Sequence, residues 1–535
     1  MLTWLAVVAI VLVGTGTWRG GRGGGGRGVL GELPPLQQPY NILVLMPISV
    51  RSHRNVIQPI AEALAERGHK VVTLTKEPTT TTSTSTSTST TPQHHPKNLT
   101  EMVTHTSIHE ADLNIFEVQQ SPGRFLWQLG NNLTRLAGNV YNDSTVRELY
   151  MKRKEFDLII VDAIFHEAFY PFLHEVPFIL VSTVTGLHHQ SAAVGNLHHP
   201  AYIPTVLWDF PRPWTLPNRL FNFGAHLLMP LIWSFLLKGG TQREISRQFP
   251  ELPSLDEIER NRSLNFINNH PGLDLPLPLL PSEIPVAGIH LRPAKPLPKD
   301  LLGWVEGAGE TGVLFVSLGS MVRGSHMHPH FRTLFVRVFR RLQQRVIWKF
   351  EKKVPELSEN VMVRRWLPQQ DVLGHPNVKA FLSHGGLLSL QEAVYHATPL
   401  VAIPICCDHT RVAAHIHNAG LGRWLAWDDL TEDLLLEAIH QVINNTRYTE
   451  EVQQASRRIQ DQPQSAREVA VFWSEYVVRH RGAPHLRSPA ANLSWIRFLL
   501  LDVLTVLALT VTFLLLVTVW VWRWFSHRTG KIKLE

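Results

Sequence analysis

Short, continuously apolar runs recur along the chain, separated by segments whose apolar residues follow a helical spacing. The first run, Asn41–Met46, precedes a helix predicted over Ile57–Glu66, which is followed by a second run, Val71–Thr75. A strand, a helix and a strand in this order predict a β-α-β unit with parallel strands. The same alternation predicts strands at 156–161, 178–182, 313–318, 346–350, 378–382 and 400–403, and helices at 331–342, 388–396 and 431–444.

A proline-rich stretch at 271–298 divides these elements into two α/β sets and is typical of an interdomain connection. We therefore predict an N-terminal domain at 17–285 and a C-terminal domain at 286–485, each a doubly wound Rossmann-like sheet, with a cleft between them. Ligands in such sheets bind at the carboxyl ends of the strands. The Thr/Ser tract at 79–91 has nothing to bury and is predicted to be a low-complexity insertion.

Both ends of the chain carry targeting patterns. Residues 1–16 are typical of a cleaved signal peptide, and residues 496–522 are long and apolar enough for one transmembrane helix. The tail at 523–535 is basic and is predicted to be cytoplasmic by the positive-inside rule, through Arg523, Arg528, Lys531 and Lys533. Its end, KIKLE, resembles a dilysine retrieval signal. We therefore predict a single-pass type I protein of the endoplasmic reticulum membrane with a lumenal body.

Asn-x-Ser/Thr tripeptides fit a lumenal, glycosylated body, although they also occur by chance. The candidate glycosylation sites are Asn98, Asn132, Asn142, Asn261, Asn444 and Asn492. A further apolar stretch, Phe223–Leu237, is too short to span a bilayer comfortably and holds Pro230. It favours a buried or acceptor-pocket helix and leaves contact with a membrane surface as the alternative.

Composition excludes some classes of partner. The chain of 535 residues is 44% hydrophobic and 18% charged, with a net charge of +7 that is not gathered into a stripe, so no nucleic-acid partner is predicted. The two cysteines, Cys406 and Cys407, are adjacent: two small buried thiols are favoured over a strained vicinal disulfide. His326, His328 and His330 lack a nearby cysteine or acid, so no metal site is predicted.

Polar residues gather where the run at 378–382 ends, in the sequence SHGGLLSLQEA at 383–393. Glycines after His384 let backbone N–H groups approach a ligand, and the N-terminus of the following helix favours an anion. Ser389 adds a hydroxyl donor, whereas Glu392 is an acceptor suited to a ribose diol. The stretch therefore indicates a nucleotide diphosphate site, although such turns also occur without a ligand.

Two flanking segments offer side chains that could bind the remaining parts of such a ligand, its base and its sugar. Trp366 beside Pro368 offers a flat ring for a base, and Gln369 offers an amide for the edge of that base. Asp408 and His409 follow another strand and can bind sugar hydroxyls. Base, ribose, diphosphate and sugar sites in this order predict that the ligand is a nucleotide sugar.

These segments resemble the signature of the UDP-glycosyltransferases, the glucuronosyl- and glucosyltransferases of the endoplasmic reticulum. The resemblance covers nearly the whole chain between its two targeting segments and includes FVSLGSM at 315–321, IWKF at 347–350, WLPQ at 366–369 and HGG at 384–386. GLLS at 386–389 resembles the invertebrate branch. The resemblance implies an α/β GT-B fold, with acceptor binding at 17–285 and UDP-sugar binding at 286–485, followed by the C-terminal transmembrane helix.

The resemblance also implies the site residues. The UDP-sugar site would comprise Ser320, Trp366, Gln369, His384, Gly386, Ser389, Glu392, Asp408 and His409. His53, expected in the loop after the first strand, would act as a general base oriented by Asp162. By position alone, these two would more often be surface residues. The chain departs from the family's Gly-Asp-Gln at Cys407-Asp408-His409, and His409 would lose its acceptor nitrogen when protonated near its ordinary pKa of about 6.5.

The predicted activity is inverting transfer of a hexosyl group from a UDP-sugar to a hydroxyl of a small lipophilic acceptor, an activity typical of detoxification. UDP-glucose is favoured over UDP-glucuronate as donor. The UDP-sugar is a co-substrate, and no cofactor is implied. The substitutions at Cys407 and His409 motivate an alternative, a membrane-anchored lipophile-binding protein of the same fold with weak or no transferase activity. Association into a homo-oligomer stays open.

Overall fold

The structure is a computed structural model that describes residues 33–531 apart from 34, 37, 47–49, 77–95, 107–115, 117–121, 186–187, 206–208, 211, 213 and 321. The predicted signal peptide at 1–16, the Thr/Ser tract at 79–91 and the last residues of the tail, with Lys533, lie outside the described residues. Leu36–Glu535 forms one compact unit, which contains every element considered below.

The first sheet is parallel throughout and has seven strands in the order β3-β2-β1-β4-β5-β6-β7. Its strands are β1 (Asn41–Leu45), β2 (Lys70–Thr75), β3 (Leu99–Val103), β4 (Leu158–Asp162), β5 (Phe178–Ser182), β6 (Leu264–Ile267) and β7 (Glu283–Pro285). The order reverses between β1 and β4, where Ile42 pairs with Leu158. At such a switch point two connections leave in opposite directions and open a crevice for ligands.

The second sheet repeats this plan with six parallel strands in the order β10-β9-β8-β11-β12-β13. They are β8 (Val313–Ser317), β9 (Arg345–Lys349), β10 (Val361–Arg364), β11 (Val378–Ser383), β12 (Leu400–Ala402) and β13 (Gly422–Trp424). Here the order reverses between β8 and β11. The prediction of two doubly wound Rossmann-like sheets is confirmed.

Helices cover these sheets, as parallel strands require. Those associated with the first half of the chain are α2 (Arg51–Glu66), α4 (Pro122–Asn139), α5 (Ser144–Met151), α6 (Tyr170–Leu173), α7 (His188–Ala193), α8 (Leu216–Ile232), a π-helical segment η5 (Trp233–Lys238), α9 (Gly239–Gln248) and α10 (Leu255–Arg260). Later ones are α11 (Lys299–Glu306), α12 (Pro329–Arg341), α13 (Gln369–Leu373), α14 (Leu387–Tyr395), α15 (His409–Asn418), α16 (Glu432–Asn444), α17 (Thr446–Gln460), α18 (Ala466–Arg479), α19 (Trp495–Phe498) and α20 (Leu501–Lys531).

The strands are buried on both faces, which explains why they read as continuous apolar runs. All five residues of β4, β5 and β8 are buried. In the second sheet Phe315 and Phe381 stack with their ring centroids 4.9 Å apart, and Trp348 lies buried against Phe335 and Phe339 on the opposite face. Aromatic packing of this density fixes the strands whose ends carry the site.

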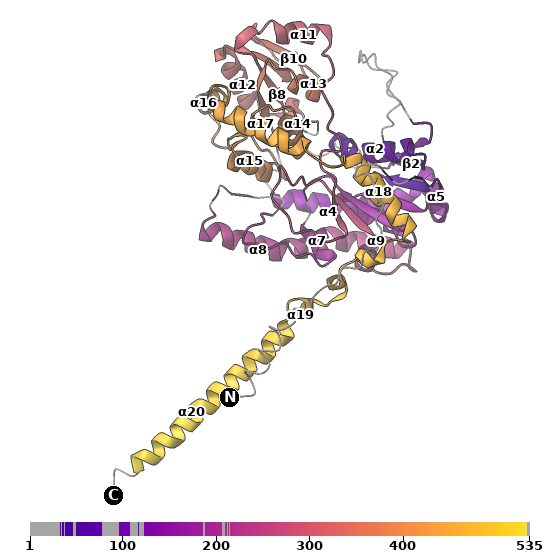
Figure 1. Cartoon of the computed structure of the whole chain (residues 1–535), viewed down its shortest axis with the longest axis vertical. Helices are drawn as coiled ribbons and strands as arrows, with labels where there is room; N and C mark the ends of the chain where they lie inside the picture. The colour runs from indigo at the N-terminus through magenta and orange to yellow at the C-terminus, as the bar shows by residue number, and fades with distance from the viewer. Residues whose placement is uncertain are drawn as a thin grey trace, which may run out of the picture. The chain divides into compact units, whose positions relative to one another are not determined.

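Helix α18 packs against α2 rather than against the second sheet, although it lies within the predicted segment 286–485 (Figure 1). Glu475 accepts hydrogen bonds from Arg67 at 2.9 Å and His69 at 3.2 Å, and Arg467 pairs with Glu66 at 3.0 Å. A capping box at Ser465 starts the helix. The chain therefore returns to the first half of the molecule before it reaches α20.

Helix α8 exposes a row of large apolar side chains, among them Leu220 at 62% and Phe223 at 51%, while Asn222 and His226 face inward. The expectation of a buried apolar helix at Phe223–Leu237 is therefore wrong for the part that lies in α8. The buried side chains of α8 are polar, and its large apolar side chains are exposed. The exposed row fits the alternative of contact with a membrane surface, which stays a prediction.

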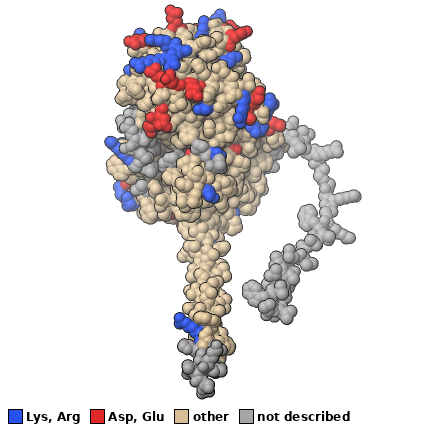
Figure 2. All heavy atoms as spheres, turned by 90° about the vertical axis from the view of Figure 1, so that its left-hand side faces the viewer, with Lys and Arg blue, Asp and Glu red and all other residues tan. Residues whose placement is uncertain are grey.

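Helix α20 is the second long apolar helix. Residues 503–522 contain no charged side chain, and every residue of Leu501–Ser526 is exposed. Figure 2 shows it as a rod of uncharged side chains with a basic residue near its far end. By length and composition, α20 and Leu216–Gln248 are the two candidate membrane spans among the described residues.

The candidate glycosylation sites differ in accessibility. Asn98, Asn142, Asn261, Asn444 and Asn492 are exposed. Asn132 is half-buried within α4, and the hydroxyl of Thr134 in its tripeptide donates to the Gly130 carbonyl at 2.9 Å. Of the six, Asn132 is therefore the least accessible to a transferring enzyme.

Candidate active site

The predicted catalytic pair meets at the switch point of the first sheet. Asp162 is the last residue of β4 and is fully buried, and its Oδ2 lies 2.5 Å from His53 Nδ1. His53 is in the first turn of α2 rather than in a loop, because that helix begins at Arg51, earlier than expected. The ring is 15% exposed. With Nδ1–H donated to the carboxylate, the basic lone pair of the neutral ring resides on Nε2.

The carboxylate of Asp162 is held by the loop that follows it. Its Oδ1 accepts the Ile164 N–H at 3.0 Å, so each oxygen has a fixed partner. The carbonyl of Ala163 accepts from Gln190 at 2.7 Å and from His166 at 2.9 Å. These bonds leave the carboxylate little freedom to rotate away from the imidazole.

A chain of hydrogen bonds links this pair to α14, the helix that follows β11 of the second sheet. Thr183, just after β5, has its hydroxyl 3.1 Å from His53 Nδ1, and its carbonyl accepts from Asn268 at 2.9 Å. The Asn268 side-chain oxygen in turn accepts from Gln391 of α14 at 2.9 Å. Thr183, Asn268 and Gln391 are each at most 3% exposed. The helix that carries Ser389 and Glu392 is thus joined to the environment of His53.

The turn between β11 and α14 has the shape expected of an anion site. Gly386 precedes the first helical residue and, having no side chain, cannot cap the N–H groups of the first turn. A Cβ on Gly319 would lie 2.7 Å from the His384 ring, and one on Gly386 would lie 2.5 Å from it. Ser320 follows Gly319 in the turn after β8. Only glycine fits at either contact, which explains the two glycine positions.

Burial, with smaller contributions from His409 and Lys349, lowers the pKa of His384 well below its ordinary value. The ring is therefore neutral at physiological pH. His384 can offer a diphosphate one N–H donor but no positive charge, so the anion would depend on the backbone N–H groups and the helix dipole.

Three predicted donor-site residues form one cluster. Gln369, the first residue of α13, donates through Nε2 to Ser389 Oγ at 3.1 Å and to Glu392 Oε2 at 2.7 Å. Its amide nitrogen therefore faces α14 and the predicted ribose position instead of the edge of a base. This differs from the role that the sequence suggested for Gln369.

Glu392 is 6% exposed, and burial raises its pKa to about 7, although the hydrogen bond from Gln369 acts in the opposite direction. His290 Nε2 lies 3.7 Å from Oε1, but burial lowers the pKa of His290 to about 4, so that ring supplies no charge. Near neutral pH the carboxyl is therefore divided between its acid and its ionised form.

This titration predicts a pH-dependent donor affinity. Ribose hydroxyls donate best to the ionised carboxylate, whose fraction rises from about one tenth at pH 6 to about nine tenths at pH 8 for a pKa near 7. We expect the Kd of UDP-glucose, whose diphosphate does not titrate in this window, to fall up to about tenfold over that range. Calorimetric titration measures it. Glu392→Gln should flatten the profile, and an unchanged slope in that variant would contradict the ribose assignment.

Trp366 lies just after β10 and is 50% exposed, so it is accessible enough to stack on a base. The guanidinium of Arg51, at the start of α2, lies over that ring at 3.7 Å from the centroid. A cation over an indole face is attracted by the ring quadrupole. One face of the predicted base platform is thus covered by a residue two positions before His53.

The loop after β12 places Asp408 before α15 and His409 as its first residue. The His409 ring is 4% exposed, packs edge-on against His384 at 4.6 Å and accepts the Cys406 N–H through Nδ1 at 3.3 Å. Burial lowers the pKa of His409 despite the opposing charge of Asp408. The expected loss of its acceptor near pH 6.5 therefore moves to more acidic pH.

The structure thus gathers the predicted residues at the carboxyl ends of two sheets. His53 and Asp162 bond directly, as do Gln369, Ser389 and Glu392, and His384 contacts His409. Sequence reasoning missed Arg51, Thr183, Asn268 and Gln391. A signal existed for Thr183 and Asn268, since each directly follows a buried strand, but neither belongs to a recognisable motif.

Solved structures share this architecture. A UDP-glucosyltransferase from Polygonum tinctorium capable of glucosylating indoxyl, solved with 3,4-dichloroaniline, aligns with a TM-score of 0.56 at 16% identity over 83% of this chain and 99% of that chain. The calicheamicin glycosyltransferase CalG4 aligns at 0.52 and 17% identity over 83% and 99%. The chain therefore has the GT-B glycosyltransferase fold.

Sequence similarity identifies the family. The model described as UDP-glucoronosyl and UDP-glucosyl transferase matches residues 41–533. UDP-glucosyltransferase 2 of Dactylopius coccus is 34% identical over 92% of this chain and 95% of its own length, and human UDP-glucuronosyltransferase 2B15 is 32% identical over 85% and 88%. The human 2-hydroxyacylsphingosine 1-beta-galactosyltransferase is 33% identical over 88% and 85%. The protein belongs to the UDP-glycosyltransferase family and is a UDP-sugar glycosyltransferase.

Proposed function

We propose that the protein transfers a hexosyl group from a UDP-sugar to a hydroxyl of a small lipophilic acceptor, with inversion at the anomeric carbon. The observation that carries this proposal is the 2.5 Å contact between His53 Nδ1 and Asp162 Oδ2 at the switch point of the first sheet. A histidine whose second nitrogen is fixed by a buried carboxylate suits deprotonation of a hydroxyl near neutral pH.

In this mechanism Nε2 of His53 accepts the acceptor's proton while the oxygen attacks the anomeric carbon. The bond from that carbon to the diphosphate breaks, and UDP leaves with the electron pair. Asp162 holds the ring and stabilises the imidazolium that forms. The uncapped N–H groups at the start of α14, with the His384 and Ser389 donors, would stabilise the departing diphosphate. Trp366 would stack on the base and Glu392 would accept from the ribose.

We propose UDP-glucose rather than UDP-glucuronate as the donor. The side chains assigned to the hexose are the Asp408 carboxylate and the His409 ring, which burial keeps neutral. Neither side chain provides a positive charge to balance the negative charge of a glucuronosyl carboxylate, and Asp408 would repel that carboxylate. Relatives named for glucosyl, galactosyl and glucuronosyl transfer reach similar identities, so the donor rests on this electrostatic argument.

A donor screen tests this assignment. Purified protein is given UDP-glucose, UDP-galactose or UDP-glucuronate with a panel of small phenols, and UDP release is measured. We expect UDP-glucose to give at least about tenfold higher kcat/KM than UDP-glucuronate, the effect of one unfavourable charge contact. Equal or faster turnover of UDP-glucuronate would contradict the proposal. Donor binding without UDP release for any acceptor in the panel would favour the alternative, a lipophile-binding protein.

We further propose a single-pass type I orientation in the endoplasmic reticulum membrane, with α20 as the anchor and the body in the lumen. Supporting features are the apolar length of Leu501–Ser526, the exposed Trp520 and Trp522, and the basic residues from Arg523 onward. Protease added to sealed microsomes should remove the tail alone. Digestion of the body from the cytoplasmic side would contradict this orientation.

A further inference from the structure

The two cysteines of the chain lie together in the loop after β12. Cys406 is buried at 7% exposure, Cys407 is partly exposed, and their sulfur atoms are 3.2 Å apart. These are the only cysteines among 535 residues. Neither has a part in the transfer mechanism proposed above.

The backbone around them forms a tight turn. His409 N–H donates to the Cys406 carbonyl at 3.1 Å, and Cys406 N–H donates back to His409 Nδ1 at 3.3 Å. Cys407, at the corner, has a φ of 57°, in the left-handed region that side chains rarely adopt. Asp408 and His409 form the rest of this turn and begin α15. The two thiols thus belong to the segment that would face the donor hexose.

We propose that Cys406 and Cys407 form a reversible vicinal disulfide that acts as a redox switch on donor binding. The oxidant is a small-molecule disulfide such as oxidised glutathione. The Cys407 thiolate attacks one of its sulfurs and releases one glutathione, and the Cys406 thiolate then displaces the second. One protein S–S bond forms, one glutathione S–S bond breaks, and the two thiol protons pass to solvent and the released thiolates.

The order of attack follows from the surroundings of each sulfur. The hydrogen bond to Cys407 and burial raise the pKa of the Cys406 thiol well above its ordinary value, so the more exposed Cys407 reacts first. Cys406 then attacks the mixed disulfide on Cys407, and this step is favoured because the two sulfur atoms are already in contact.

Closing the bond must disturb the turn. The sulfur atoms have to approach from 3.2 Å to about 2.05 Å within two adjacent residues, and this changes the torsions on both sides of the Cys406–Cys407 peptide. The reciprocal bonds between Cys406 and His409 depend on those torsions. Oxidation is therefore expected to shift Asp408 and His409 and to weaken donor binding. This effect rests on the proposed donor-site role of these two residues.

The test uses the full-length protein in detergent, equilibrated with reduced or oxidised glutathione. Intact mass and free-thiol titration report the disulfide, and steady-state kinetics with UDP-glucose report the switch. We expect a monomer that has lost two hydrogens and both free thiols. The KM for UDP-glucose should rise about three- to tenfold, the loss of one hydrogen bond, and dithiothreitol should reverse it. Cys406→Ser should keep the reduced KM and lose the response.

Cys407→Gly serves as a second variant, because glycine adopts the left-handed corner without strain and removes the other thiol. Thiols that stay reduced, stable glutathione adducts or disulfide-linked dimers would each overturn the proposal. So would a vicinal disulfide that leaves the KM unchanged. A disulfide that forms in a protein without UDP-glucose turnover in either redox state would instead contradict the donor assignment.

Discussion

Replacing His53 by alanine is expected to lower kcat for sugar transfer about 10²- to 10⁴-fold, the usual contribution of a positioned general base. The affinity for UDP should stay within about twofold, because the residues assigned to UDP lie around the second sheet and do not bond to His53. Asp162→Asn should cause a loss of similar order, since the uncharged amide stabilises an imidazolium poorly and can turn its NH2 group to Nδ1, which leaves the ring in the wrong tautomer. Initial rates of UDP release and calorimetric UDP binding measure the two effects separately.

Two controls sharpen this test. The exposed His174 offers a matched substitution, and His174→Ala should leave kcat unchanged. The double variant His53→Ala with Asp162→Asn should be no slower than His53→Ala alone, because residues that act as a unit are not additive. Retention of more than about a tenth of kcat in His53→Ala would exclude general-base catalysis by this ring.

The sequence predicted the strands best where both faces are buried. Runs such as Phe178–Ser182 and Val378–Ser383 were placed to within one residue, because parallel strands between helices are apolar at every position. The strand Gly422–Trp424 was missed because it is short and lies at a sheet edge. The start of α2 was missed because its first turn, Arg51 to Arg54, is wholly polar, so no apolar period marks it.

For the site, the sequence supplied residue identities but not their partners. His53 and Asp162 are 109 residues apart, and only the return of β4 beside β1 brings them to hydrogen-bond distance. Gln369 was assigned to a base because an amide suits a base edge, yet its proximity to α14 turns it to Glu392. The link from Gln391 through Asn268 to Thr183 depends on tertiary packing alone, since asparagine and glutamine carry no local signature of such contacts.

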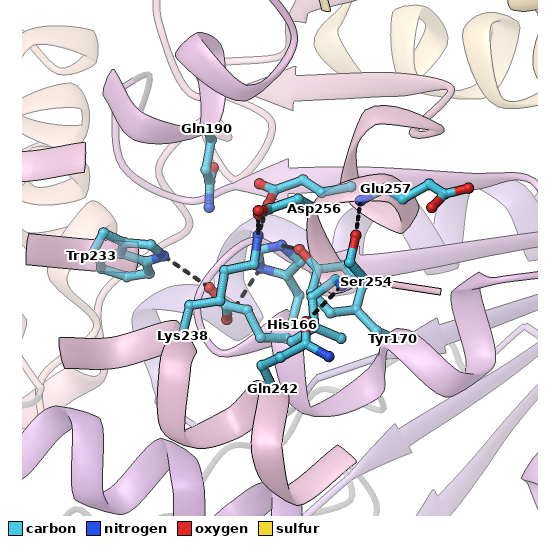
Figure 3. A network of polar contacts seen from close by, with 12 residues as sticks. His166, Tyr170, Gln190, Trp233, Lys238, Gln242, Ser254, Asp256 and Glu257 are labelled. Atoms are coloured by element: carbon cyan, nitrogen blue, oxygen red, sulfur yellow. Dashed lines mark hydrogen bonds and ion pairs between the residues drawn. The ribbon is translucent and has the colours of Figure 1, made fainter. Parts of the chain in front are cut away.

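A network of charged side chains around Lys238 lies close to His166 (Figure 3). Lys238, at the end of the π-helical segment, has its Nζ 2.7 Å from Glu259 and 2.5 Å from Asp256. Burial alone would lower the pKa of Lys238, but the charges of Glu259 and Asp256 outweigh it and raise that pKa. Trp233 of the same segment donates to Glu167 at 3.1 Å, which joins the π-helical segment to the short 3-10 helix His166–Phe169.

The two carboxylates differ in exposure, and this difference predicts their effects on stability. The Glu259 side chain is 8% exposed, whereas that of Asp256 is 66% exposed. Glu259→Gln leaves a buried ammonium without its buried counterion, and Lys238→Met leaves the buried carboxylate without its direct partner. Each is expected to destabilise the protein by about 3 kcal/mol, which lowers Tm by several degrees. Asp256→Asn should have little effect, because solvent screens that contact.

Thermal unfolding of the detergent-solubilised chain at neutral pH measures all three variants. Lys152→Met provides the matched surface control, since Lys152 pairs with Glu148 at 2.7 Å while both side chains are more than half exposed, and its Tm should match the unmodified protein. If Asp256→Asn lowered Tm as much as Glu259→Gln, the contribution of each carboxylate to stability would not depend on its burial. The expected order instead makes Glu259 the counterion that keeps Lys238 buried, and Lys238 in turn anchors the π-helical segment whose Trp233 bonds to Glu167.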